Sequence, residues 1–183
     1  QFEGESAIKG VRRVLHTQAD DFSTSSLFRE NVRSLASRGL SFDLCVLPRQ
    51  LSYGIELVKA CPKVQFILDH CGIPDVKGQS LDPWRADVRK LAELPNVAAC
   101  KISGLVAYAD ASRWTVNDLK PFVDHVVECF GHDRIIFGSD WPVCTLTCPL
   151  LDWVKAAGTL AEKWSSDDQN KFFSHNAKRV YRI

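Results

Sequence analysis

A carboxylate and an imidazole that can do chemistry each follow a short apolar segment of the chain. Asp140 lies in the motif FGSDWP at the end of the apolar segment 134–138, and His70 lies in LDHCG after the segment 64–68. A carboxylate serves as a general acid or base or binds a metal ion, and an imidazole polarises a carbonyl or binds a metal ion near neutral pH. Asp140 and His70 are therefore the candidate catalytic residues, and the candidate ligands if the site holds a metal. Asp69 precedes His70, and strand alternation does not decide which of the two faces inward.

Other polar side chains lie in or just after the remaining apolar segments, where they can orient the oxygens of a polar substrate. The candidate substrate-binding residues are His16, Arg49, Gln50, Lys101 and Trp141. For Arg49, Gln50 and Lys101, structural pairing with Asp43 is an equally good interpretation. Trp141 can floor a pocket or simply pack against its neighbours.

Three histidines and two cysteines are interpreted as structural. His125 lies within an expected helix, His132 in a Gly-His-Asp turn and His175 near a helix junction. Cys144 and Cys148 are four residues apart but have no adjacent further ligands, which argues against a zinc site between them.

Five apolar segments must position the candidate residues, and each is followed by a loop and a helical pattern. The expected strands are 11–15, 42–46, 64–68, 97–102 and 134–138, and the expected helices are 25–39, 51–62, 82–94 and 115–131, with two or three more within 152–181. Consecutive strands lie too far apart for hairpins, which indicates βαβ units with parallel strands. Residues 1–183 show no linker, so a single domain is expected.

Alternation along these strands separates an apolar face from a polar one. Phe42 and Leu44 lie opposite Asp43, and Cys100 lies opposite Lys101. In a (β/α)8 barrel the apolar faces meet the helices, and the polar groups point inward and gather at the carboxyl ends of the strands. An open doubly wound sheet also binds ligands at its carboxyl ends, and the pattern does not separate the two folds.

Composition excludes several classes of function. Lys and Arg number 23 and Asp and Glu 22, so the net charge of +1 gives no footprint for nucleic acid or an anionic membrane. The sequence shows neither a membrane-spanning run nor a signal peptide, so we expect a cytoplasmic protein with a small-molecule substrate. The 7 cysteines form no C-x-x-C pair and are expected to be reduced. Because the sequence has no methionine, we expect that it is not a complete translation product.

Five motifs, read together, resemble one family along nearly the whole chain. They are GVRRV at 10–14, LDHCG at 68–72, CKISGL at 100–105, FGSDWP at 137–142 and NAKRVY at 176–181. The chain resembles the amidohydrolase-related (amidohydrolase-2) family of metal-dependent hydrolases, in the branch of sugar-acid lactonases and 2-pyrone-4,6-dicarboxylate lactonase.

The resemblance implies that this chain is the larger part of a (β/α)8 TIM barrel. The five strands would be strands four to eight, so that the barrel is incomplete and truncated at its N-terminal end. The family's N-terminal His-x-His has no counterpart in the sequence. A divalent metal, zinc or manganese, is implied for the complete protein. The two open sheet edges favour self-association.

The resemblance also implies a reaction, the hydrolysis of a lactone. Asp140 would activate the attacking water and later protonate the leaving alkoxide, while His70 would polarise the carbonyl or bind a metal. Only Arg49 is well placed for a substrate carboxylate, which favours a neutral sugar lactone. The alternatives are a decarboxylase of aromatic acids from the same superfamily and an inactive truncated remnant.

Overall fold

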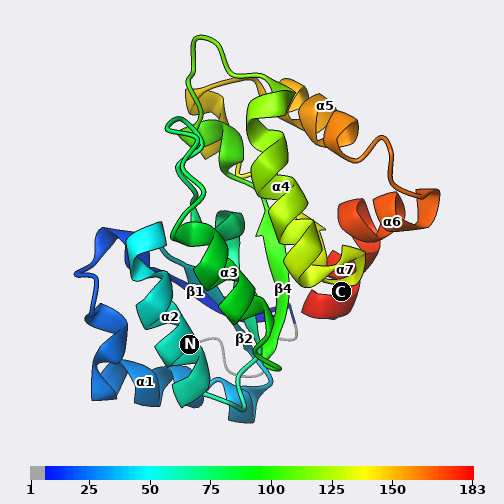
Figure 1. The fold of residues 1–183 in the computed structure, drawn as a ribbon. Coiled ribbons are helices and arrows are strands. Elements are labelled where there is room, and N and C mark those ends of the chain that lie inside the picture. Colours follow the sequence, from blue (N-terminus) through cyan, green and yellow to red (C-terminus); the bar gives the residue numbers. More distant parts are fainter. Residues whose placement is uncertain (1–6) are drawn as a thin grey trace.

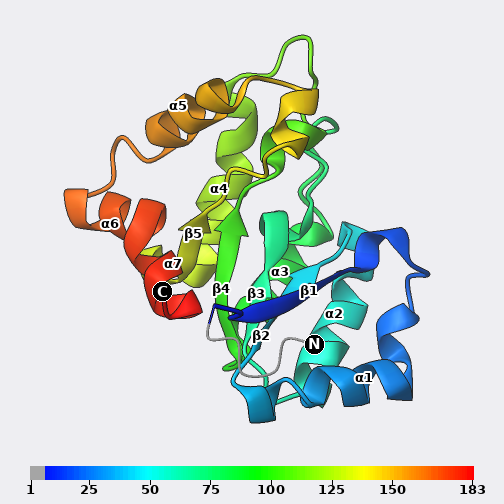
Figure 2. The same ribbon diagram turned by 180° about the vertical axis from the view of Figure 1, so that it is seen from behind.

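The sheet consists of five parallel strands, each where the sequence predicts one. In the computed structural model, which describes residues 7–183, they are β1 Gly10–Val14, β2 Ser41–Cys45, β3 Phe66–Leu68, β4 Val97–Ile102 and β5 Ile135–Phe137. Their order in space equals their order in sequence, and all neighbouring pairs are parallel. Because the order never reverses, there is no topological switch point, which excludes the doubly wound alternative. β1 crosses β4 at a steep angle, as in the wall of a barrel (Figure 2).

Helices connect the strands and, except for the last one, cover one face of the sheet (Figure 1). Within residues 7–183 they are α1 Ser26–Arg33, α2 Leu51–Ala60, α3 Trp84–Ala92, α4 Val116–Phe130, α5 Leu150–Leu160, α6 Ser166–Asn170 and α7 Asn176–Tyr181. The first helix is shorter than the expected 25–39, because the chain tightens into a 3₁₀ turn at Ala36–Arg38 before it stops at Gly39, whose φ is 64°. A π turn at Lys171–His175 separates α6 from α7. No helix in the described part of the chain is long and apolar enough to cross a membrane.

The main core lies between the sheet and these helices. The strand residues that point toward the helices, such as Phe42, Leu44, Phe66 and Leu68, are fully buried there. This is the apolar face that the alternation predicts. Burial of such side chains contributes about 1.5–3 kcal/mol each, so this core is the main source of the stability of the sheet.

The opposite, inner face of the sheet is covered at its lower end by α7. Val180 packs against Ile67, Ala99 and Ile136 in a small second core. The Asn176 side chain donates to the carbonyl of Ile135, where β5 begins, at 2.8 Å. α7 therefore covers the amino ends of the strands, and the carboxyl ends at the other end of the inner face are left to form a site.

Candidate functional site

A left-handed turn brings both Asp69 and His70 to the inner side of the sheet. β3 ends at Leu68, and the residues after Asp69 take positive φ values, 52° at His70 and 55° at Cys71. This turn breaks the alternation of a strand, so consecutive side chains no longer point to opposite faces. The sequence does not decide whether Asp69 or His70 faces inward, and the structure shows that both do.

The two predicted catalytic residues lie together. His70 Nε2 is 3.7 Å from Asp140 Oδ1, and both side chains are mostly buried. The other ring nitrogen, Nδ1, lies 2.8 Å from the Oγ of Ser103, which follows β4. Three strand ends, those of β3, β4 and β5, thus supply one cluster.

Burial raises the pKa of Asp140 above that of a free aspartate, although the nearby His70 and Arg12 lower it. A raised pKa makes a carboxyl group better able to hold a proton and to release it near neutral pH. This is the electrostatic setting that a general acid–base residue needs.

His16 and Cys45 form a second contact beside this cluster. Cys45 Sγ lies 3.4 Å from His16 Nδ1. Burial raises the pKa of Cys45 to about 12, so its thiol is protonated at neutral pH. The pKa of His16 is lowered by burial and by the electrostatic effects of His70 and Arg12, which favours a neutral imidazole. His16, Cys45, His70 and Asp140 are called the mouth group below.

Below the mouth group lies a network of side chains joined by ion pairs and hydrogen bonds. The inner network consists of Arg12, Asp43, Asp69, Lys101 and Tyr181. Lys101 Nζ donates to Asp43 and lies 2.8 Å from Asp69 Oδ1, and the Tyr181 hydroxyl donates to Asp43 at 2.9 Å. Burial alone would lower the pKa of Lys101, but Asp69 and Asp43 raise it. Lys101 therefore makes the structural pairing with Asp43, rather than presenting a free ammonium to a substrate.

Three other predicted substrate-binding residues make their contacts outside the mouth group or are exposed. Arg49 pairs with Asp20 at 3.0 Å on the surface, with its side chain 61% exposed. Gln50 is buried, but its amide donates to the carbonyl of Leu15 at 3.1 Å, and this hydrogen bond links two loops. Trp141 is 66% exposed and is not part of a core. The alternative pairing with Asp43 thus holds for Lys101 alone.

Sequence reasoning missed two residues near the mouth group. Arg12 lies opposite Asp43 in the register of β1 and β2, and side chains at such positions point to the same face of a sheet. The inward direction of Asp43 therefore also gives that of Arg12. Its Nη1 lies 3.4 Å from Asp69 Oδ2. Tyr108 lies in the turn after β4, and its pKa is raised by burial and by Cys45 and Asp140. Its position after a strand end was the only signal in the sequence.

The histidines interpreted as structural lie apart from the mouth group. His125 is buried in α4, where its Nε2 lies 2.9 Å from the carbonyl oxygen of Arg85. His132 packs edge to face on Trp164, and His175 is exposed.

The residues present fit a metal ion of the zinc type. One ligand atom each from Cys45, Asp69 and His70 lie within 4.8 Å of one another. A thiolate, a carboxylate and an imidazole are all zinc ligands. Asp69 Oδ1 is buried without a well-aligned hydrogen bond, although Lys101 Nζ lies 2.8 Å away, so this oxygen has capacity for a further partner. His70 is one of the two ligands expected from the sequence, and the other, Asp140, lies beside it.

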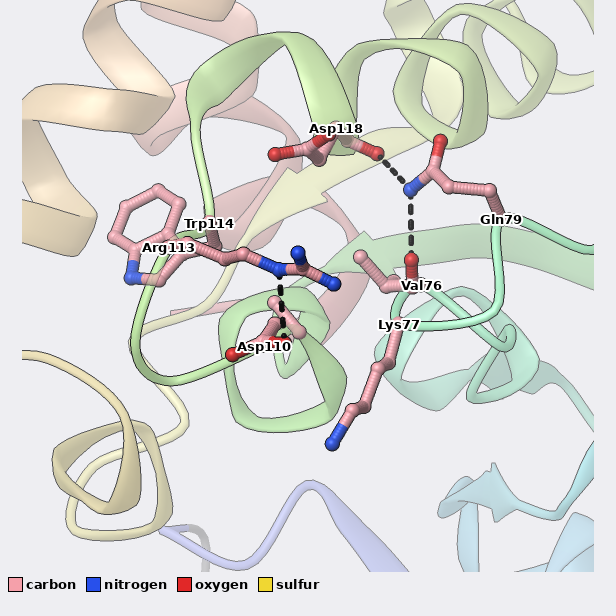
Figure 3. A pocket seen from close by; sticks show the side chains of 8 residues that line it. Val76, Lys77, Gln79, Asp110, Arg113, Trp114 and Asp118 are labelled. Carbon is pink, nitrogen blue, oxygen red and sulfur yellow. Dashed lines mark hydrogen bonds and ion pairs between the residues drawn. The ribbon is translucent and has the colours of Figure 1, made fainter.

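A separate hollow lies between residues 76–79 and 109–118 (Figure 3). Two of its polar side chains are paired within the hollow: Arg113 Nε donates to Asp110, and the Gln79 amide donates to the carbonyl of Val76. The hollow contains no member of the mouth group. It is therefore not the site of the chemistry that His70 and Asp140 can perform.

Comparison with known proteins defines the class. The chain matches the amidohydrolase family (Amidohydro_2) over residues 3–183, and it belongs to this family. It is 32% identical to an L-fucono-1,5-lactonase of Burkholderia multivorans and 29% identical to one of Burkholderia ambifaria, each over 96% of this chain. An uncharacterized protein, y4mH of Sinorhizobium fredii, is 32% identical over the same share. The chain spans 61–63% of the length of these relatives. The resemblance to the lactonase branch is confirmed.

Solved structures confirm the partial barrel. An amidohydrolase of Burkholderia multivorans with bound zinc superposes with a TM-score of 0.89 at 31% identity, and 96% of this chain covers 64% of that one. A probable 2-pyrone-4,6-dicarboxylic acid hydrolase of Acinetobacter baumannii, at 21% identity and a TM-score of 0.76, shares the fold. The five strands are thus part of an amidohydrolase barrel, as predicted.

Proposed function

We propose that the protein hydrolyses a lactone, the cyclic ester of a sugar acid. The observation that carries the proposal is the pairing of His70 with Asp140 at the carboxyl ends of β3 and β5. The relatives named L-fucono-1,5-lactonase support this reaction over the decarboxylation of aromatic acids and over an inactive remnant.

The reaction needs one proton to be moved twice. Asp140 takes a proton from the water that attacks the lactone carbonyl, and returns it to the ring oxygen as the carbon–oxygen bond breaks. The raised pKa of Asp140 supports both steps. His70 donates a hydrogen bond to the carbonyl oxygen, where negative charge develops. The product is an open-chain hydroxy acid.

If the complete protein binds a divalent metal, Cys45, Asp69 and His70 would hold it, and His70 would then be a ligand in place of a hydrogen-bond donor to the carbonyl. We favour zinc over manganese, because thiolate and imidazole ligands suit zinc and oxygen ligands suit manganese. A bound zinc ion supplies Lewis-acid polarisation of a carbonyl.

The substrate is proposed to be a neutral sugar lactone. Binding of a dicarboxylate or an aromatic acid needs free arginines at the mouth, because carboxylates are recognised by charged, bidentate donors. Arg12 is engaged by Asp69, and Arg49 is engaged by Asp20. These pairings leave hydroxyl groups as the substrate features that the site suits best.

Self-association through a sheet edge and a cytoplasmic location complete the proposal. β1 is an edge strand of the described sheet, and Val11 is 41% exposed on it, which favours pairing with another chain. All seven cysteines are free thiols, which supports a reducing compartment. Sedimentation should show dimers or larger species at micromolar concentration, and a stable monomer would contradict the pairing.

Assays against three substrate groups test the reaction. The purified complete protein is offered neutral sugar-acid lactones, 2-pyrone-4,6-dicarboxylate and aromatic carboxylic acids, with proton release and carbon dioxide as the two readouts. We expect proton release with the neutral lactones. Release of carbon dioxide from an aromatic acid, without lactone hydrolysis, would replace lactonase by decarboxylase.

A further inference from the structure

The hydroxyl of Ser103 has no part in the reaction proposed above, although it contacts a catalytic residue. Ser103 is 1% exposed, and its Oγ lies 2.8 Å from His70 Nδ1. The other ring nitrogen, Nε2, faces Asp140 Oδ1 at 3.7 Å. Each edge of the imidazole therefore has one defined neighbour.

Two glycines keep the ring and the hydroxyl in place. A Cβ on Gly104 would lie 3.0 Å from His70 Nδ1, so the ring rests directly against the Gly104 backbone. A Cβ on Gly138 would lie 2.8 Å from the Cβ of Ser103 and 3.1 Å from its Oγ. The carbonyl of Gly138 in turn accepts from Trp153 Nε1 at 2.9 Å, which fixes the peptide behind Ser103. Neither side chain has space to move away from the other.

We propose that Ser103 is a positioning residue that presents His70 Nε2 to the site and sets the tautomer of the ring. In the metal-free protein its hydroxyl donates to Nδ1, and the neutral imidazole carries its proton on Nε2. The catalytic consequence rests on the lactonase function proposed above; the tautomer does not.

The chemistry of the neighbours determines this direction. A neutral imidazole has one donor and one acceptor nitrogen, and an ionised carboxylate has only acceptors. Because Nε2 faces Asp140, a proton on Nε2 meets an acceptor, whereas a lone pair there would meet another lone pair. Nδ1 is then the acceptor, and the serine hydroxyl is the donor that it needs. Nε2–H becomes the group that polarises the lactone carbonyl.

Imidazole nitrogen spectra test the tautomer without any substrate. Chelator-treated protein is labelled with ¹⁵N, and His70 is assigned by the loss of its signals in His70→Gln. At mildly alkaline pH, where free imidazole is neutral, the wild-type ring should show a protonated Nε2 and an unprotonated Nδ1. In Ser103→Ala the two nitrogen shifts should move toward each other, because the partner that selects the tautomer is gone.

Ser41→Ala is the matched control. Ser41 is also 1% exposed, and its hydroxyl bonds the carbonyl of Lys9 at the opposite end of the strands. This substitution should leave the His70 signals and kcat unchanged. Ser103→Ala should lower kcat by about tenfold, as loss of a group that orients a functional histidine does, with a smaller change in KM.

Gly138→Ala covers the case in which Ser103→Ala does not fold. The added methyl displaces Ser103, so the His70 signals should change in the same direction. A wild-type ring protonated on Nδ1, or unchanged signals in folded Ser103→Ala, would overturn the proposal. If no lactone is hydrolysed by any of these proteins, the spectra still decide the role of Ser103, and only the lactonase function fails.

Discussion

The mouth group and the inner network lie on the same face of the same sheet, but they differ in how completely their polar atoms are paired. In the inner network, Lys101 is shared by Asp43 and Asp69, and Tyr181 adds a hydrogen bond to Asp43. Two cations and two carboxylates give no net charge there. In the mouth group, His70 Nε2 and Asp140 Oδ1 are 3.7 Å apart, which is beyond hydrogen-bond distance, and Cys45 Sγ lies 3.4 Å from His16 Nδ1.

This difference separates structural from functional polar groups inside one barrel. A buried charge must be paired, and a group that is fully paired has nothing to offer a ligand. The atoms of the mouth group are close without being fully satisfied, so they can accept a water, a carbonyl or a metal. Asp69 belongs to the inner network but also lies close to Cys45 and His70, and so connects the inner network with the mouth group.

The largest expected effect comes from the mouth group. Asp140→Asn keeps the size of the side chain but removes the base, so lactone hydrolysis should fall by roughly 10²–10⁴, the usual contribution of general acid–base catalysis. Steady-state kinetics and circular dichroism on the same preparation measure activity and folding. His125→Asn is the control, because His125 is buried in α4 against Arg85. Near-normal turnover by folded Asp140→Asn would contradict the assignment.

The inner network should show the opposite behaviour, a loss of stability. Lys101→Met leaves Asp43 and Asp69 without their shared cation, and removal of one partner from a buried ion pair typically costs 3–5 kcal/mol, so we expect a loss of about that size. Urea unfolding measures it. Lys120→Met is the matched control, since Lys120 pairs with Asp124 on the surface and should change the free energy of unfolding by less than about 1 kcal/mol. Equal losses in both variants would mean that the inner network contributes no more to stability than a surface ion pair does.

Patterns local to one segment predicted the fold, whereas contacts between segments had to be seen. The five strands and the inward direction of Lys101 follow from alternation, which depends on a single strand. The partner of Lys101 at the far end of the chain, Tyr181, depends on where α7 docks. Motif resemblance made His70 and Asp140 the candidate catalytic residues, and the structure places both just after strand ends.

Two of the predicted substrate-binding residues contact other loops for the same reason. Arg49 and Gln50 lie after a strand end, as His70 does, but the chain turns at once into α2 and carries them to loop contacts with Asp20 and Leu15. A position after a strand end is therefore not sufficient to place a residue in the mouth group. The left-handed turn that directs His70 inward contains Cys71 and Ile73 at positive φ, and these residue types give no signal for such a turn.

A smaller loss of stability should follow from removing one hydroxyl of the inner network. Tyr181→Phe deletes the hydrogen bond to Asp43 and should reduce the free energy of unfolding by about 1–3 kcal/mol. Tyr53→Phe provides the comparison, because the Tyr53 hydroxyl makes no hydrogen bond within residues 7–183. Burial and the nearby Asp43 raise the pKa of Tyr181, so the folded protein keeps this proton longer than the unfolded chain. Its contribution should be present below about pH 10 and decline as pH rises further. A wild-type stability that does not fall more steeply in that range than that of Tyr181→Phe would contradict this.

The smallest expected effect belongs to Arg49, which is part of neither the mouth group nor the inner network. Its guanidinium is 61% exposed and pairs with Asp20, and exposed pairs contribute about 0–1 kcal/mol. Arg49→Gln should therefore change neither the free energy of unfolding by more than about 1 kcal/mol nor KM for a neutral sugar lactone by more than about twofold. The same substitution at Arg12, which bonds the buried Asp69, should disturb both the stability and the mouth group. A large rise in KM for Arg49→Gln would mean that Arg49 leaves Asp20 to bind the substrate. An anionic substrate would then become the better assignment, because a free arginine at the mouth is the feature that carboxylate recognition needs.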